Sequence, residues 1–217
     1  MKPVSRMPDG AEPTWEIANL FPAQGTWSEE EYLALNTNHL VELSNGVLEV
    51  LPMPTQRHQA ISRFLFLAFF FYLQPRAGTV FYAPLRLRVR DGEFREPDLL
   101  LMRDAGDPRR QDRYWLGADL VAEIVSPDEP HRDLVKKRRD YARARIPEYW
   151  IVDPREEKIL VLRLSGKRYV VHGEFRRGET ATSHLLPGFS VDVEKAFAHA
   201  ASLGTIPRKK RKTKRSS

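Results

Sequence analysis

The sequence predicts a mixed α/β fold in which helices flank a central mixed sheet. Residues 119–153 have the pattern of a strand, a charged helix and a second strand, which is typical of a βαβ unit with parallel neighbouring strands. Asn45-Gly46 separates two strand-like runs and therefore predicts an antiparallel hairpin. Residues 55–73 carry apolar side chains at helical spacing around much of their circumference, so this helix is expected to pack against the sheet.

Length and composition favour one domain with two tails. The chain has 217 residues, of which 41% are hydrophobic, enough for a substantial core. We expect an irregular lead-in over residues 1–27, a folded domain over 28–200 and a disordered basic tail over 201–217. The absence of cysteine excludes disulfides and thiolate metal sites. Because no apolar run is long enough for a membrane span and no signal-peptide pattern is present, a soluble cytoplasmic protein is expected.

The positive charge of the chain is concentrated in the C-terminal tail. Without the seven basic residues of this tail the net charge of +6 falls to −1, so the domain itself is not basic. Such a run favours binding to a polyanion such as nucleic acid, and a solubilising end is an equally weighted alternative. The basic residues are Arg208, Lys209, Lys210, Arg211, Lys212, Lys214 and Arg215.

The elements of the N-terminal half follow from local signals. Ser28 and Glu31 form a capping box, which predicts a short helix through Leu35. The hairpin is expected over residues 40–51. The long helix should run from Thr55 to Leu73. Residues 80–89 alternate in polarity and predict one strand, and a second strand is expected over residues 97–102.

The C-terminal half begins with the βαβ unit. Its helix is expected to start near Asp133 and to end near Ile146, since a residue before proline disfavours the helical region. Three further strands are predicted, over residues 159–164, 168–172 and 179–186. A short helix over residues 193–198 should close the domain.

Three acids lie within strand-like runs of apolar residues. A buried carboxylate is costly without a partner, so Glu42, Asp98 and Glu123 together suggest one shared site. A divalent cation relieves repulsion between clustered carboxylates, and oxygen ligands favour Mg²⁺ or Mn²⁺. The alternative is that each acid faces solvent in the ordinary alternation of its strand. Considered singly, Glu42 fits that alternative better, whereas Asp98 and Glu123 fit the site better.

The combined motifs resemble those of a known nuclease family. The segments VELSNGVLEV, EPDLLL, AEIVSPD and DLVKKRRDYARARIPEYWIVDP, with a helix that opens near His58, resemble the Uma-two family of the PD-(D/E)xK nuclease superfamily. The resemblance covers about residues 28–198. It implies a restriction-endonuclease-like core with an added antiparallel hairpin region.

The resemblance also implies roles for individual residues. Asp98 and Glu123 match the two metal-binding acids, the carbonyl of Ile124 would be a further ligand, and Glu42 matches an acid ahead of the core motif. The superfamily places a lysine two residues after the second acid. This chain has Val125 there.

A replacement lysine is available on the next helix. Asp133, Lys137 and Tyr141 are spaced four residues apart and share one helical face. The resemblance makes Lys137 the migrated catalytic lysine, with Tyr141 as an accessory residue, whereas Lys136 points about 100° away. The alternative is an exposed acid–lysine pair. His58 could contact a phosphate or cap its helix.

These expectations lead to three functional hypotheses. The first is a metal-dependent endonuclease acting on DNA, with Mg²⁺ or Mn²⁺ as cofactor. The second is a nucleic-acid-binding module that keeps the nuclease fold without turnover, because a fold does not guarantee its chemistry. The third is a structural or regulatory protein whose acids are solvated. A homodimer is compatible with cutting two strands, although nothing in the chain indicates one.

Overall fold

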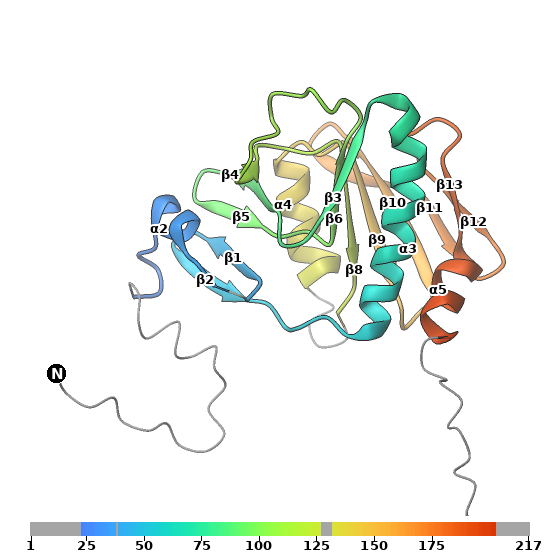
Figure 1. Cartoon of the computed structure of the whole chain (residues 1–217), viewed down its shortest axis with the longest axis horizontal. Coiled ribbons are helices and arrows are strands. Elements are labelled where there is room, and N and C mark those ends of the chain that lie inside the picture. Colours follow the sequence, from blue (N-terminus) through green and yellow to red (C-terminus); the bar gives the residue numbers. More distant parts are fainter. Residues whose placement is uncertain (1–22, 38, 127–131, 203–217) are drawn as a thin grey trace, which may run out of the picture.

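The computed structural model describes residues 23–37, 39–126 and 132–202. Two mixed sheets form the body of the protein, and a small two-stranded sheet adjoins them. Helices α3 and α5 cover one side of the larger sheet and α4 lies on the other side (Figure 1). The predicted mixed α/β fold with a sheet flanked by helices is therefore confirmed. The basic residues of the tail lie outside the described residues.

The larger sheet has six strands in the order β11-β10-β9-β8-β6-β3. Neighbouring strands are antiparallel except β8 and β9, which are parallel. In chain order these strands are β3 (Thr79–Tyr82), β6 (Leu99–Met102), β8 (Leu120–Ile124), β9 (Glu148–Asp153), β10 (Lys158–Ser165) and β11 (Arg168–Arg176).

The parallel pair β8 and β9 confirms the predicted βαβ unit. Its helical part has two segments, η2 (Arg132–Lys137), which has the wider turns of a π-helix, and α4 (Arg138–Arg143). The helix ends three residues before the expected end at Ile146. Arg145 adopts a left-handed conformation with φ of 60°, which an α-helix cannot continue through.

The second sheet has five strands in the order β2-β1-β5-β4-β7. The predicted hairpin forms its edge, and Asn45 and Gly46 take positive φ values of 49° and 77° as the tight turn requires. The predicted capping box at Ser28 and Glu31 is also present. The elements of this part are α2 (Glu29–Ala34), β1 (Val41–Ser44), β2 (Val47–Val50), β4 (Arg86–Arg90), β5 (Glu93–Arg95) and β7 (Tyr114–Trp115).

The single strand predicted over residues 80–89 is wrong. The structure divides this stretch into β3 and β4, which belong to different sheets. Pro84 lies between them, and proline cannot donate a backbone hydrogen bond to a neighbouring strand. The strand β5 was not predicted, because its three residues are too few to show alternation.

The C-terminal segments differ from prediction in their lengths. The strand expected over residues 179–186 is limited to β12 (Thr180–Thr182), which pairs with β13 (Ser190–Asp192). Ser183 stops β12 because its hydroxyl accepts hydrogen bonds from the amides of Leu185 and Leu186, which turns the chain. The closing helix α5 (Val193–Ser202) is longer than expected.

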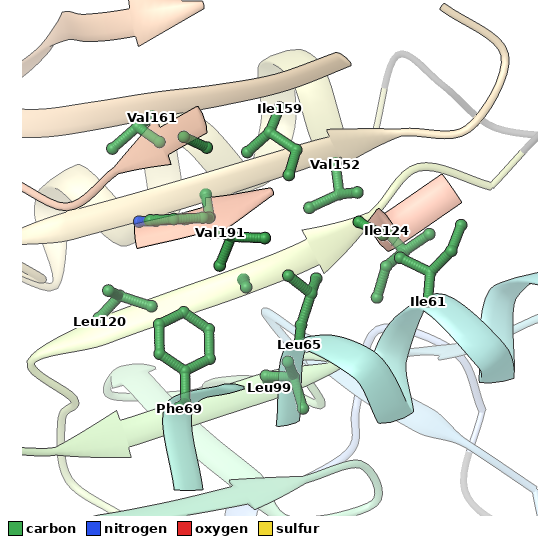
Figure 2. Packing of buried hydrophobic residues seen from close by; sticks show 14 of the residues in the cluster. Ile61, Leu65, Phe69, Leu99, Leu120, Ile124, Val152, Ile159, Val161 and Val191 are labelled. Carbon is green, nitrogen blue, oxygen red and sulfur yellow. The ribbon is translucent and has the colours of Figure 1, made fainter. Parts of the chain in front are cut away.

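Helix α3 (Gln56–Leu73) supplies much of the main core, and η1 (Gln74–Arg76) follows it. Ile61, Leu65 and Phe69 point from α3 onto the sheet, and Figure 2 shows them against side chains of β6, β8 and β9. Thr55 caps the helix by accepting a hydrogen bond from the amide of His58. The first turn of α3 is thus fixed at one end of β8. Within the described part of the chain, the helices are too short or too polar to cross a membrane.

Candidate active site

A cleft opens where α3 begins and where β8 and β9 end. Residues of four separate segments line it: the linker before α3, the turn before β6, the end of β8, and the turn after β9. Lys137 reaches the same cleft from η2. The carboxyl ends of parallel strands are the usual place for a ligand site in α/β proteins, and this cleft lies beyond those of β8 and β9.

Asp98 stands immediately before β6, on the wall of the cleft. Its Oδ2 accepts a hydrogen bond of 2.7 Å from the backbone amide of Ile124 and lies 3.1 Å from Nε2 of His58. The side chains of Asp98 and His58 are 17% and 16% exposed, so both remain accessible from the cleft. Proline at 97 and the start of the strand thus place this carboxylate against the end of β8.

Glu123 lies in β8 and is almost fully buried. In the pairing of β6 with β8, Leu99 is opposite Ala122, so Asp98 stands opposite Glu123 one step further along. Oε1 of Glu123 accepts hydrogen bonds from Nζ of Lys137 at 2.8 Å and from the hydroxyl of Tyr141 at 2.5 Å. Two donors at one oxygen hold this carboxylate in a single orientation.

Lys137 and Tyr141 converge on Glu123 from the helical part of the βαβ unit. Lys137 is 3% exposed, which excludes the alternative of an exposed surface pair. Burial, together with the charges of Glu123 and Glu42, raises the pKa of Tyr141 well above its usual range, so its phenol stays protonated and donates. The side chain of Asp133, the third member of the predicted face, lies outside the described residues.

Glu42 joins the same cluster from β1. Its Oε1 lies 3.5 Å from Nζ of Lys137 and accepts a hydrogen bond of 3.2 Å from the amide of Glu96. Because Glu42 is 1% exposed, the alternative that it faces solvent from its strand is wrong. Strand alternation failed as a guide because Lys137 of η2 and Arg95 of β5 contact this carboxylate.

Arg95 is a member of the cluster that sequence analysis missed. It is buried in β5, where its Nη2 lies 2.6 Å from Oδ2 of Asp140 and its Nε lies 3.7 Å from Oε2 of Glu42. Its guanidinium also donates to the carbonyl of Leu43 at 3.0 Å. Arg95 therefore ties the hairpin to α4, and the two cations Lys137 and Arg95 balance most of the charge of Glu42, Glu123 and Asp140. The only sequence signal was the charged run Glu93-Phe94-Arg95-Glu96 directly before Asp98.

Glu96 is a further cleft residue that was not predicted. Its Oε2 accepts a hydrogen bond of 3.0 Å from the amide of Val41, and its Oε1 lies 3.6 Å from Nε of Arg86. Burial raises the pKa of Glu96 to about 8, more than the charge of Arg86 lowers it, and the nearby Glu42 raises it further. The cleft thus contains a carboxyl group that holds its proton near neutral pH.

Three other predicted residues take distinct positions. His58 does not cap α3, since Thr55 does, and its ring faces Asp98 instead. Lys136 is half-buried and pairs with Glu49, the cross-strand neighbour of Glu42, rather than with Glu123. Ile124 lines the cleft and contacts Asp98 through its amide, so the role predicted for its carbonyl stays a prediction.

The donor set of the cleft fits a hard divalent cation. Asp98 and Glu123 present carboxylate oxygens to one cleft, and Mg²⁺ typically binds through one or two carboxylates and keeps several waters. No group of three or more Asp, Glu or His side chains in the described part of the chain has the arrangement of a complete metal site.

The family model Uma2, described as "Putative restriction endonuclease", matches residues 29–194, which include every member of the cluster described above. The chain belongs to the Uma2 family. A crystal structure described as "a putative nuclease belonging to DUF820" from Anabaena variabilis ATCC 29413 has a similar fold, with a TM-score of 0.66 and 20% sequence identity. The match covers 80% of this chain and 99% of that one. No curated protein matches the chain.

The match to the Uma2 family confirms the resemblance drawn from the motifs. The similar crystal structure adds the fold, because at 20% identity likeness in structure carries no residue roles. In this Uma2 protein the two acids of the motifs, Asp98 and Glu123, line one cleft with Lys137.

Proposed function

We propose that this protein is a Mg²⁺- or Mn²⁺-dependent endonuclease that hydrolyses phosphodiester bonds in DNA. One observation carries the proposal. Asp98, Glu123 and Lys137 come from three elements, and they line a single cleft in which the ammonium of Lys137 lies 2.8 Å from Glu123. Two carboxylates and one lysine are the chemical groups that metal-assisted phosphodiester hydrolysis needs.

Each residue has a role that its contacts support. Asp98 and Glu123 would hold the cation, which when bound polarises a phosphate and lowers the pKa of a coordinated water. Lys137 would neutralise negative charge that develops on the phosphate, or orient the attacking water. Tyr141 holds Oε1 of Glu123 in place, and Glu42 holds the ammonium of Lys137 from the opposite side.

Position 125 supports the migrated lysine. Val125 packs in the same core cluster as Val121 and Tyr141, on the side of β8 from which Glu123 contacts Lys137. A lysine at 125 and a lysine at 137 would therefore approach the cluster from the same side, one from the strand and one from the helix. Lys137 would thus supply, from the same side of β8, the positive charge that position 125 lacks.

The test is incubation of the purified full chain with supercoiled plasmid DNA in Mg²⁺, in Mn²⁺ or in EDTA. We expect nicked or linear product with either metal and none in EDTA. Asp98→Asn and Glu123→Gln should abolish the product, whereas Asp112→Asn, at an exposed site away from the cleft, should not. Cleavage in EDTA equal to that in Mg²⁺ would contradict the proposal. Cleavage by Asp98→Asn equal to that by the parent chain would also contradict it.

A second function is favoured by one observation. The ammonium of Lys137 is already held by two buried carboxylates, Glu123 and Glu42, which is also what a purely structural lysine would show. In that case the protein binds nucleic acid on a nuclease fold without turnover. The plasmid would then shift in a gel and remain intact under every metal condition.

A further inference from the structure

The two walls of the cleft differ in chemical character. One wall is the linker between β2 and α3, where Leu51, Pro52, Met53 and Pro54 present apolar surface. The other carries Arg57 and Arg155. Asp98, Glu123 and His58 line the same cleft.

The backbone at Met53 is restricted, and the residue is exposed. Met53 is 73% exposed, the highest value among the exposed large hydrophobic residues of the described chain. Pro52 and Pro54 flank it, so the backbone on both sides has a fixed φ, and a residue before proline is restricted to extended conformations. A single exposed apolar side chain is ordinary. One whose backbone is restricted by two prolines in the lining of a charged cleft is well placed for contact with a ligand.

The arginine wall, Arg57 and Arg155, can bind an anion. Nη2 of Arg57 donates a hydrogen bond of 2.7 Å to the carbonyl of Pro154, which brings Arg57 next to Arg155. Arg57 also pairs loosely with Glu157 at 3.4 Å, on the exposed side. Arg155 is exposed, and its guanidinium makes no hydrogen bond or ion pair with the described residues. A phosphate is the anion that arginine recognises best in planar, paired contacts.

The lining of the cleft favours an unpaired base over a paired one, because apolar side chains and arginines line the same cleft. In a duplex, neighbouring bases cover both faces of each base, so an apolar wall would have nothing to contact. An unpaired base exposes its faces and can pack on apolar side chains.

We propose that the cleft takes an unpaired nucleotide of DNA, with its base against Met53 and Leu51 and a phosphate at Arg57 and Arg155. The preferred substrate is then single-stranded DNA, a frayed end or a distorted duplex. This inference rests on the proposed function for the identity of the polymer. Met53 acts as the apolar wedge that keeps the base away from its neighbour, as methionine does in other proteins that unstack DNA.

The test measures binding in EDTA, where no cleavage can occur. The full chain is titrated onto an oligonucleotide that contains 2-aminopurine, either single-stranded or in a duplex of equal length. We expect tighter binding of the single strand and a rise in 2-aminopurine fluorescence, because unstacking relieves its quenching. Met53→Ala should weaken single-strand binding about 5- to 10-fold and remove most of that rise. Phe71→Ala, also on an exposed apolar side chain but outside the cleft, should change neither.

The arginine wall is tested by salt dependence. Arg155→Ala should lower the slope of log affinity against log salt by about 0.7, the loss of one phosphate contact on a single strand. Arg143→Ala, on the exposed surface of α4, is the matched control. The basic tail contributes equally to all these variants, since each is made in the full chain.

The outcomes separate this inference from the proposed function. Equal affinity of Met53→Ala and the parent chain, or equal affinity for single strand and duplex, overturns the inference even if plasmid is cut. A fluorescence rise that depends on Met53, in a protein that never cuts plasmid, supports the inference and overturns the nuclease.

Discussion

The ammonium of Lys137 lies 2.8 Å from Oε1 of Glu123, although one residue belongs to a helix and the other to β8, the first strand of the βαβ unit. Both groups are almost completely buried, at 3% and 2% exposure. Loss of either partner of a buried ion pair destabilises the fold, because the remaining charge is buried without a counter-ion or solvent. This relationship makes Lys137 testable by both activity and stability.

The first prediction concerns this lysine. Lys137→Ala should remove most cleavage, whereas Lys136→Ala should remove little because Lys136 pairs with Glu49 and not with the metal-binding acids. Lys137→Ala should also cost about 3–5 kcal/mol in the free energy of unfolding, since Glu42 and Glu123 lose their shared cation. The loss for Lys136→Ala should be within about 1 kcal/mol. Both are measured by urea denaturation.

The strand position provides a rescue. Val125→Lys added to Lys137→Ala should restore a measurable part of the cleavage, because it returns a charge to the same side of β8. Circular dichroism must show that the compared variants are folded. Full activity of Lys137→Ala under saturating Mg²⁺ would mean that the lysine is structural.

The second prediction tests the metal through stability. A cation bound at ten times its Kd should stabilise the fold by about 1.4 kcal/mol, so Mg²⁺ or Mn²⁺ should raise the Tm of the parent chain. Asp98→Asn should abolish this rise and abolish cleavage. In EDTA its Tm should be close to that of the parent, because the asparagine oxygen can still accept from the amide of Ile124. A metal-induced rise that persists in Asp98→Asn would place the cation elsewhere.

The third prediction concerns Glu96 and pH. Its pKa is about 8 in the fold against an ordinary value of 4.5, so between these pH values the native state binds the extra proton. The contribution of Glu96 to stability is therefore full below about pH 4.5 and declines as pH rises toward 8. Glu96→Gln should remove this decline and become more stable than the parent at pH 8.5, by a few kcal/mol at most. Urea denaturation at pH 5, 7 and 8.5 measures it. The exposed control Glu156→Gln should show the pH profile of the parent, and an unchanged profile in Glu96→Gln would refute the prediction.

The fourth prediction concerns Arg95, which joins two elements. Arg95→Met should cost about 3–5 kcal/mol, because the buried carboxylate of Asp140 loses its partner. The double change Arg95→Met with Asp140→Leu should recover part of this loss, since it removes the stranded charge as well. Arg95→Lys should not substitute fully, because Arg95 donates to several acceptors at once. Additive losses in the double variant would show that the two residues are not coupled.

The fifth prediction concerns the basic tail, residues 208–215. Removal of the chain after Pro207 should leave the fold intact and weaken DNA binding. The slope of log affinity against log salt should fall by up to about 6 for duplex DNA, if all seven cations contact phosphates. Equal slopes for the full and shortened chains would make the tail irrelevant to binding.

The sequence predicted the elements whose signals are local. The hairpin at Asn45-Gly46, the capped helix at Thr55 and the parallel strands on either side of the charged helix all follow from turn chemistry, capping and periodicity. The division of residues 80–89 between two sheets could not be predicted from alternation. The pattern continues through Pro84, and only the contacts of each half with other strands decide where it belongs.

In the candidate site, too, some residues could be predicted from the sequence and others could not. Asp98 and Glu123 were identifiable because a charge inside an apolar strand is conspicuous, and the family motif pointed to Lys137. The burial of Glu42 could not be identified in this way, because Arg95 and Lys137, which contact it, lie far from it in the sequence. Arg95 and Asp140 were missed for a related reason. Each looks like an ordinary surface charge until the fold brings them within 2.6 Å of each other.

The order of the site residues along the chain has a consequence for synthesis of the protein. Glu42, Asp98, Glu123 and Lys137 are spread over almost a hundred residues, and β8 gains its parallel neighbour only when β9, ending at Asp153, has been made. Pro154 and Arg155, which also line the cleft, follow β9 and are made later still. A nascent chain that ends before β9 therefore has the acids but lacks this part of the cleft. If the finished cluster cuts DNA as proposed, we expect cleavage to require a chain that extends beyond Asp153.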